Sequence, residues 1–149
     1  IYIIYDNIKN YLKYFTVGSF DIVLSNPPFF KVTENKELLN DLEQLSIARH
    51  EIELNLDELI EISSKLVKDR GYFYLVHRAD RLSEILVTLQ KYNFEAKKIK
   101  FCYTTKQKNA KIVLIEAIKN GKVGLSILPP LVINKDNGEY TDEVLKMFE

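Results

Sequence analysis

The sequence predicts an α/β fold, in which a sheet of mainly parallel strands carries helices on its faces and an antiparallel strand pair near its C-terminal end. Between residues 20 and 118 the hydrophobic pattern reads strand, helix, strand, helix, strand, strand. Strands that alternate with helices favour a parallel sheet. The apolar run at residues 22–24 is typical of a parallel strand buried on both faces. The last two strands are separated only by a short polar segment, which predicts a hairpin-like connection.

The N-terminal elements come first. Residues 1–5 are apolar and predict a strand that ends at Asp6. Ile8, Leu12 and Phe15 then follow at helical spacing, which predicts a short amphipathic helix. Residues 20–25 predict a second strand, which must end at residues 26–28 because proline cannot donate to a sheet ladder.

Two helices are expected next. Residues 37–47 could form one, although the segment 31–54 is polar and hard to assign. The second is clear: Asn55 can serve as its N-cap, and Glu58 lies three residues on, as in a capping box. We expect Gly71 to close this helix. One apolar stripe runs along it, formed by Leu56, Leu59, Ile60, Ser63, Leu66 and Val67.

The remaining elements are short. Residues 72–77 predict a strand, and Asp80 is expected to cap a helix that ends near Asn93. Strands follow at about 96–104 and 111–118, joined by the lysine-rich segment 105–110. A turn at 136–138 and a last helix at 141–148 complete the chain.

Composition limits the class of protein. The chain has 149 residues, no net charge, 46% hydrophobic and 28% charged residues, which is typical of one soluble globular domain. Its single cysteine, Cys102, lies in an apolar run and is expected to be buried and inert. No apolar stretch reaches a membrane-spanning length, and no signal peptide or metal-binding Cys/His spacing is visible. We therefore expect a cytoplasmic protein without a metal.

The charges are unevenly distributed. Residues 32–70 carry ten acidic and five basic side chains, whereas residues 91–122 carry nine lysines against two glutamates. A basic block of this kind can attract phosphates. It can equally be the solvated surface of two lysine-edged strands, and the sequence does not decide between these two interpretations.

The segment Asn26-Pro27-Pro28-Phe29 is the strongest functional signal. The exocyclic amine of a base has its lone pair delocalised into the ring, and acceptors placed on both N–H bonds make that lone pair more available. The Asn26 side-chain oxygen and the Pro27 carbonyl can be these acceptors, while two prolines fix the backbone and Phe29 can stack on the base. The alternative is a plain turn at the end of a strand.

Residues 21–29 resemble motif IV of the amino-methylating, Rossmann-like class I methyltransferases. The resemblance to one bacterial subgroup, the valine-tRNA adenine-N6 methyltransferases, covers nearly the whole chain. It implies S-adenosyl-L-methionine as the cofactor, an adenine beside the anticodon of tRNA(Val) as the substrate, Asp6 and Asn26 as cofactor contacts, and residues 26–29 as the target-base site. Three further segments carry it: residues 48–51, residues 71–78, and residues 129–133 with 136–141.

The chain departs from this family in one respect. Family members carry a glycine-rich cofactor loop after their first strand, but the five glycines here are at 18, 71, 121, 124 and 138. We therefore expect residues 1–149 to be the C-terminal portion of a single methyltransferase domain with an incomplete sheet. Alone, the chain should bind the cofactor weakly or not at all, and micromolar binding by calorimetry would contradict this. The apolar edge at residues 20–25 is expected to allow self-association.

Other residues are weaker candidates for function. Arg49 and His50, in a polar triplet before the capped helix, could line the target-base pocket, or Arg49 could simply pair with Glu51 at the surface. Lys106 and Lys108 suggest tRNA contact, in which case affinity should fall steeply with salt. His77 is expected at a strand end. Two other functions remain open: methylation of another planar amine (DNA adenine, ribosomal RNA guanine N2 or protein glutamine), and a fragment that is catalytically incomplete.

Overall fold

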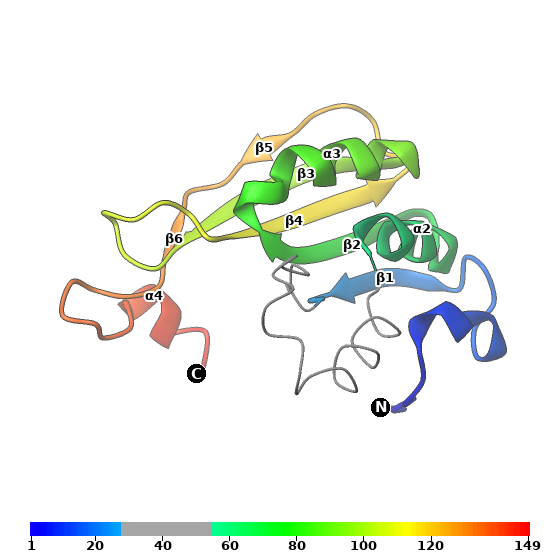
Figure 1. The fold of residues 1–149 in the computed structure, drawn as a ribbon, viewed down its shortest axis with the longest axis horizontal. Coiled ribbons are helices and arrows are strands. Elements are labelled where there is room, and N and C mark those ends of the chain that lie inside the picture. Colours follow the sequence, from blue (N-terminus) through cyan, green and yellow to red (C-terminus); the bar gives the residue numbers. More distant parts are fainter. Residues whose placement is uncertain (28–54) are drawn as a thin grey trace, which may run out of the picture.

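The computed structural model describes residues 1–27 and 55–149 (Figure 1). Their centre is a six-stranded sheet in the order β1-β2-β4-β3-β5, with β6 also pairing with β3. The predicted α/β class is confirmed. The strands are β1 (Phe20–Ser25), β2 (Val67–Arg78), β3 (Phe94–Tyr103), β4 (Ile112–Lys119), β5 (Ser126–Ile127) and β6 (Leu131–Val132).

The sheet is mixed. β1 pairs with β2 in parallel, whereas β4 pairs antiparallel with both β2 and β3. β4 therefore lies reversed between two strands that run in the same direction. The predicted antiparallel pair and its hairpin connection are confirmed. The sequence pattern did not indicate that the returning strand would be inserted beside β2.

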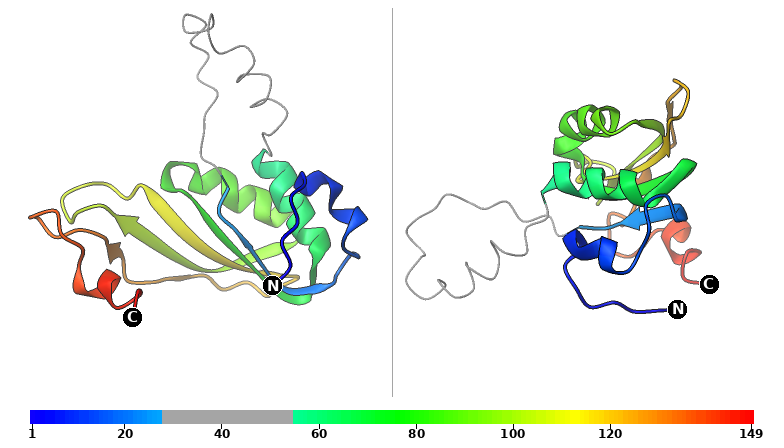
Figure 2. Two further views of the ribbon diagram at one scale, coloured as in Figure 1. Left: turned by 90° about the horizontal axis from the view of Figure 1, so that it is seen from below. Right: turned by 90° about the vertical axis from the view of Figure 1, so that its right-hand side faces the viewer.

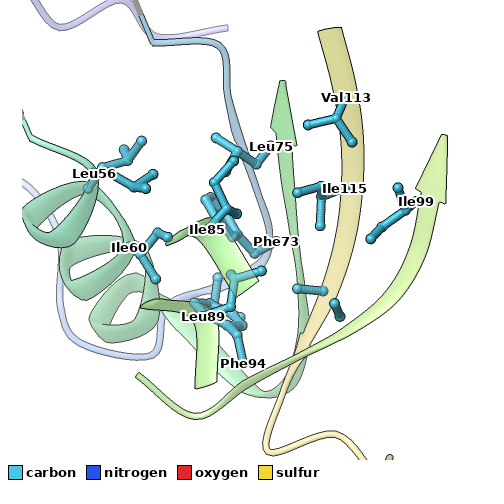
Figure 3. Packing of buried hydrophobic residues seen from close by; sticks show 14 residues of the cluster. Leu56, Ile60, Phe73, Leu75, Ile85, Leu89, Phe94, Ile99, Val113 and Ile115 are labelled. Atoms are coloured by element: carbon cyan, nitrogen blue, oxygen red, sulfur yellow. The ribbon is translucent and has the colours of Figure 1, made fainter. Parts of the chain in front are cut away.

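Two helices, α2 (Leu56–Leu66) and α3 (Leu82–Lys91), cover one face of the sheet (Figures 1 and 2). They bury the alternate side chains of β2, of which Phe73 is fully buried and Leu75 is 1% exposed. Phe73 stacks on Phe94, with ring centroids 5.2 Å apart. The main core gathers around this pair (Figure 3). The predicted stripe of α2 is confirmed, since all six of its residues are buried.

α2 begins as predicted but ends earlier. The Asn55 side chain accepts a hydrogen bond from the Glu58 N–H at 2.8 Å, and the Glu58 carboxylate accepts one from the Asn55 N–H at 3.4 Å. The helix stops at Leu66, so Gly71 is not its terminator and lies within β2. The Lys119 ammonium from β4 donates to the Val67 carbonyl at 3.0 Å and also to the Ser64 carbonyl, and so satisfies the end of the helix.

The predicted N-terminal strand is wrong. Residues 1–5 are exposed and form no strand in the described part of the chain. An apolar segment forms a strand only where a neighbour accepts its hydrogen bonds. The following segment is a 3₁₀ helix, η1 (Ile8–Lys13), which buries Tyr11 against α2 rather than Ile8 or Leu12.

Two details near α3 also differ from expectation. Asp80 does not cap a helix: it lies in the short helix η3 (Ala79–Arg81) and pairs with Arg78. α3 has no side-chain cap, and it ends at Lys91, close to the predicted Asn93. The last helix is confirmed only as the four-residue α4 (Asp142–Leu145), which Thr141 caps.

The second face of the sheet is only partly covered. Near β6, Cys102, Leu131 and Val144 form a small cluster, and burial raises the pKa of the Cys102 thiol, as expected for a buried, inert cysteine. β1 is not buried on both faces, because Ile22 and Leu24 are 58% and 73% exposed. In residues 1–27 and 55–149, no helix is long and apolar enough to cross a membrane.

Candidate functional site

The candidate site begins where β1 leaves the sheet. Ser25 pairs with Leu75, and the next two residues, Asn26 and Pro27, follow with the Asn26 side chain exposed and Pro27 half-buried. This is the carboxyl end of a parallel strand, where ligands bind in open α/β sheets. The other two predicted catalytic residues, Pro28 and Phe29, lie outside the described residues, as do Arg49 and His50.

The lysine-rich connection between β3 and β4 lies at the same end of the sheet. Arg78, at the end of β2, pairs with Ile112 at the start of β4, and Ile112 also pairs with Cys102 near the end of β3. Residues 104–111 therefore leave and re-enter the sheet at the carboxyl end that carries Asn26 (Figure 1). The topology thus brings Lys106 and Lys108 to the edge of the candidate site, two strands away from β1.

Both lysines of this connection are exposed, and they form no ion pair with another described residue. Lys111 is a third exposed cation here, and its backbone N–H donates to the Cys102 carbonyl at 3.2 Å. Sequence reasoning missed Lys111 because it was assigned to a strand. Its place in the lysine-rich run was the signal that could have identified it.

His77 lies one residue before the end of β2 and points toward the helices. It is 4% exposed, and its Nδ1 accepts a hydrogen bond of 2.8 Å from the Arg78 N–H. Burial first, and the Arg81 charge second, lower the pKa of the imidazole. His77 is therefore neutral at pH 7 with its proton on Nε2. It supports this edge of the sheet from the core side.

Asp6 has partners of its own. Its Oδ1 accepts from the Asn10 amide at 2.8 Å and from the Asn7 N–H at 2.7 Å, and its Oδ2 accepts from the Tyr14 hydroxyl at 2.7 Å. These three hydrogen bonds, with the nearby Lys13 ammonium, lower the pKa of the carboxyl to about 2. An ion pair of 2.9 Å between Lys9 and Glu58 joins this segment to the first turn of α2.

The two predicted cofactor contacts, Asp6 and Asn26, are both exposed in the structure. Asp6 is held by its own helix, and the apolar segment before it is not part of the sheet. No group of three or more histidine, cysteine, aspartate or glutamate side chains among residues 1–27 and 55–149 is placed to hold a metal ion.

Comparison with known proteins gives a consistent set of relatives, although no family model matches the chain. The tRNA1(Val) (adenine(37)-N6)-methyltransferase of Porphyromonas gingivalis is 29% identical over 133 residues, which cover 87% of this chain and 50% of that protein. The enzyme of the same name from Phocaeicola vulgatus is 27% identical, covering 86% and 52%. This chain spans about half the length of the curated relatives that it matches most fully.

Solved structures agree on the fold. A predicted O-methyltransferase from Agrobacterium tumefaciens superposes with a TM-score of 0.65 at 19% identity, covering 89% of this chain and 52% of that one. A candidate DNA modification methylase from Thermus thermophilus, complexed with S-adenosyl-L-methionine, gives 0.52 at 15% identity, covering 80% and 56%. This chain is therefore a distant homologue of the tRNA1(Val) (adenine(37)-N6)-methyltransferases, with a class I methyltransferase fold.

Proposed function

We propose that this chain is the C-terminal portion of a single methyltransferase domain that uses S-adenosyl-L-methionine to methylate N6 of an adenine in tRNA. The observation that carries the proposal is the position of Asn26 and Pro27. They follow a parallel strand directly, at the carboxyl end of the sheet, in a chain whose curated relatives act on tRNA1(Val). The adenine beside the anticodon of tRNA(Val) is the proposed target.

The role of the loop follows from the chemistry of the amine. The Asn26 Oδ1 accepts a hydrogen bond from one N–H of the adenine amine, and the Pro27 carbonyl accepts from the other. Both acceptors favour a more tetrahedral nitrogen, whose lone pair is then available for attack. Proline at positions 27 and 28 fixes φ, so that the carbonyl stays aimed without ordering at each turnover. Phe29 stacks on the face of the base.

No strong base is required at this site. The nitrogen becomes cationic on attack and loses its proton afterwards to solvent. This agrees with the burial of His77, which is turned toward the helices and neutral at pH 7. We assign His77 no catalytic role.

The substrate RNA is proposed to lie across the lysine-rich connection. Lys106, Lys108 and Lys111 are exposed at the same end of the sheet as Asn26, and phosphate contacts by lysine position a nucleic acid without reading its sequence. Arg49 and His50 are proposed to contribute from the loop before α2. Asp6 and Asn26 are proposed cofactor contacts, and the remaining contacts would come from the half of the domain that this chain does not span.

Two other functions are consistent with part of this proposal. The same loop suits any planar amine, so a DNA adenine, a guanine N2 or a glutamine side chain would use Asn26 in the same way. A catalytically incomplete fragment would keep the fold and lose turnover. The curated relatives are about twice as long as the region that matches this chain. This favours catalytic incompleteness for the isolated 149-residue chain only.

The test uses the longest reading frame that encodes this chain. The purified protein is incubated with S-adenosyl-L-methionine and unmodified tRNA, and the digested RNA is analysed for N6-methyladenosine by mass spectrometry. We expect product, and Asn26→Ala should lower the turnover rate by about 100-fold or more, the cost of losing one aimed polar group in an active site. Gln90→Ala, exposed near the end of α3 and at the opposite end of the sheet from Asn26, is the matched control. Parallel reactions replace the tRNA with DNA or protein, and product in one of these but not in tRNA would overturn the substrate assignment.

A further inference from the structure

Arg78 is a cation at the carboxyl end of β2, between the Asn26 loop and the lysine-rich connection. β2 lies between β1 and β4 in the sheet (Figure 1). Arg78 is the last residue of β2 and pairs with Ile112, the first residue of β4. The N–H of the next residue, Ala79, donates to the Lys111 carbonyl at 2.9 Å. Arg78 therefore has the connection on one side and the end of β1 on the other.

Arg78 and Asn26 belong to the same face of the sheet. His77 is buried beneath the helices, so Arg78 takes the opposite face, because successive side chains of a strand alternate. Leu24 is exposed on that opposite face, and Asn26 follows it by two residues. Continued by one residue, the register of β1 and β2 leaves Arg78 two residues beyond the position opposite Asn26. With strands about 4.8 Å apart and a rise of about 3.3 Å per residue, the two Cα atoms lie roughly 8 Å apart.

The guanidinium of Arg78 is oriented by a neighbour and still has open donors. Its Nε donates to one oxygen of the Asp80 carboxylate at 3.0 Å, and its Nη2 donates to the other. An arginine has five N–H donors, and those on Nη1 make no hydrogen bond to residues 1–27 or 55–149. The side chain is 34% exposed. An oriented guanidinium with open N–H groups suits a phosphate, which it binds with defined geometry.

Distance divides the phosphate contacts between Arg78 and the lysines. β4 and β3, which carry the lysine-rich connection, are two and three strands from β1, or about 10 and 14 Å. A base held at Asn26 keeps its own phosphates within one nucleotide, so the lysines reach neighbouring nucleotides instead. Arg81 does not replace Arg78, because it pairs with Glu84 at the start of α3.

We propose that Arg78 binds a phosphate that flanks the target adenosine, and so positions the adenine at Asn26. This inference rests on the proposed function, since it requires a nucleic acid as the substrate. It adds a contact to the target nucleotide itself, whereas the lysines contact the RNA further along the strand. Arg78 is a positioning residue and takes no part in the transfer of the methyl group.

The experiment measures how the longest reading frame that encodes this chain binds a synthetic anticodon stem-loop of tRNA(Val) at several salt concentrations. Arg78→Gln is expected to weaken binding by about tenfold at low salt. Loss of one phosphate contact should also make the slope of log K against log[salt] less steep by about 0.7. A purely structural role for Arg78 would leave that slope unchanged. Arg70→Gln is the matched control, because Arg70 is exposed in the same strand at the opposite end of the sheet.

A modified RNA locates the contact. The two phosphates that flank the target adenosine are replaced, one at a time, by an uncharged methylphosphonate. At one of these positions the parent protein should lose about tenfold in affinity, and Arg78→Gln should lose nothing further, because both changes remove the same contact. Asp80→Asn keeps the cation and removes only an exposed ion-pair partner, so the salt slope should not change.

The outcomes separate this inference from the proposed function. Additive losses at both phosphates, or an unchanged salt slope in Arg78→Gln, would overturn the role of Arg78 even if the parent protein methylates the stem-loop. Equal losses in Arg78→Gln and Asp80→Asn at an unchanged slope would show that the pair only supports the short helix η3. A stem-loop that the parent protein neither binds nor methylates would overturn the proposed function, and this inference with it.

Discussion

Gly71→Ala tests how β2 passes the start of β1, at the end of this strand that lies opposite to the candidate loop. Phe20 pairs with Val67, but Ile22 pairs with Tyr72, so residues 68–71 of β2 bulge beside Asp21. A Cβ on Gly71 would lie 2.9 Å from the Asp21 carbonyl oxygen and 2.7 Å from the Val67 Cγ1. The first neighbour is backbone and the second belongs to a fully buried side chain, so neither can move away easily.

Two effects of opposite sign decide the result. Alanine reduces the conformational freedom of the unfolded chain, which stabilises by about 0.4–1 kcal/mol. Overpacking a tight contact destabilises by about 1–3 kcal/mol, because strands or side chains must shift. The clash involves two contacts under 3.0 Å, so we expect it to dominate. The net loss should be about 1–2 kcal/mol, or roughly 2–8 °C in Tm for a chain of this size.

Urea unfolding followed by far-UV circular dichroism measures this loss as a lower midpoint at an unchanged slope. Gly18→Asn is the control: a Cβ at Gly18 meets nothing within 4 Å, and asparagine tolerates its φ of 66°. The control should change stability by less than about 0.5 kcal/mol. A stability of Gly71→Ala equal to or above that of the parent chain would refute the argument, because entropy would then outweigh the contact with β1.

Two further predictions concern α2 and β2. Asn55→Ala removes the side-chain acceptor of the capping box and should lower the unfolding free energy by about 1 kcal/mol, whereas Asn109→Ala in the exposed connection should not; equal urea midpoints would contradict the cap. His77 has a lowered pKa in the folded protein, so the unfolded chain takes up a proton near pH 6.5 that the folded chain resists. The unfolding free energy should therefore fall as pH drops through 6.5 toward the folded-state pKa, by at most about 1.4 kcal/mol per pH unit. His77→Gln should flatten that slope between about pH 5 and 7, and an unchanged slope would show that another group titrates.

Elements with strong local signals were predictable. The end of β1 at Ser25 follows from the two prolines at 27 and 28, since neither can donate to a ladder. The start of α2 at Asn55 follows from a side chain that accepts the Glu58 N–H. Both signals act over a few residues, so they can be read without knowledge of tertiary contacts. They also fixed the position of the candidate loop at a strand end.

Elements determined by distant contacts were not predictable. α2 ends at Leu66 because the Lys119 ammonium, more than fifty residues away, satisfies its last carbonyls, and the sequence offered Gly71 as the nearer terminator. The insertion of β4 beside β2 is also determined by distant contacts. A hairpin signal predicts that β3 and β4 pair, but only the apolar side chains Val113 and Ile115, buried beneath the helices, place β4 next to β2.

In the candidate site too, the features with local signals were predictable and those that depend on distant contacts were not. The Asn26 loop was assigned from its own residues, and the topology then placed the Lys106 connection at the same edge, which no local pattern could indicate. Asp6 was matched by resemblance alone. In the structure its carboxylate accepts hydrogen bonds from the side chains of Asn10 and Tyr14, in and just after the helix that follows it. With the one from the Asn7 N–H, these three hydrogen bonds leave part of the acceptor capacity of this exposed carboxylate open.

Residues 1–5 and 20–25 show most directly that a segment needs a neighbouring strand to form a strand itself. Both are apolar β-type segments, and local propensity alone predicts a strand for each. Residues 20–25 lie beside β2 and form a strand, whereas residues 1–5 have no strand beside them in the described part of the chain and stay exposed. Strand formation requires a neighbour to accept the backbone hydrogen bonds. Local propensity therefore sets which segments can form a strand, and the presence of a neighbouring strand decides which of them do.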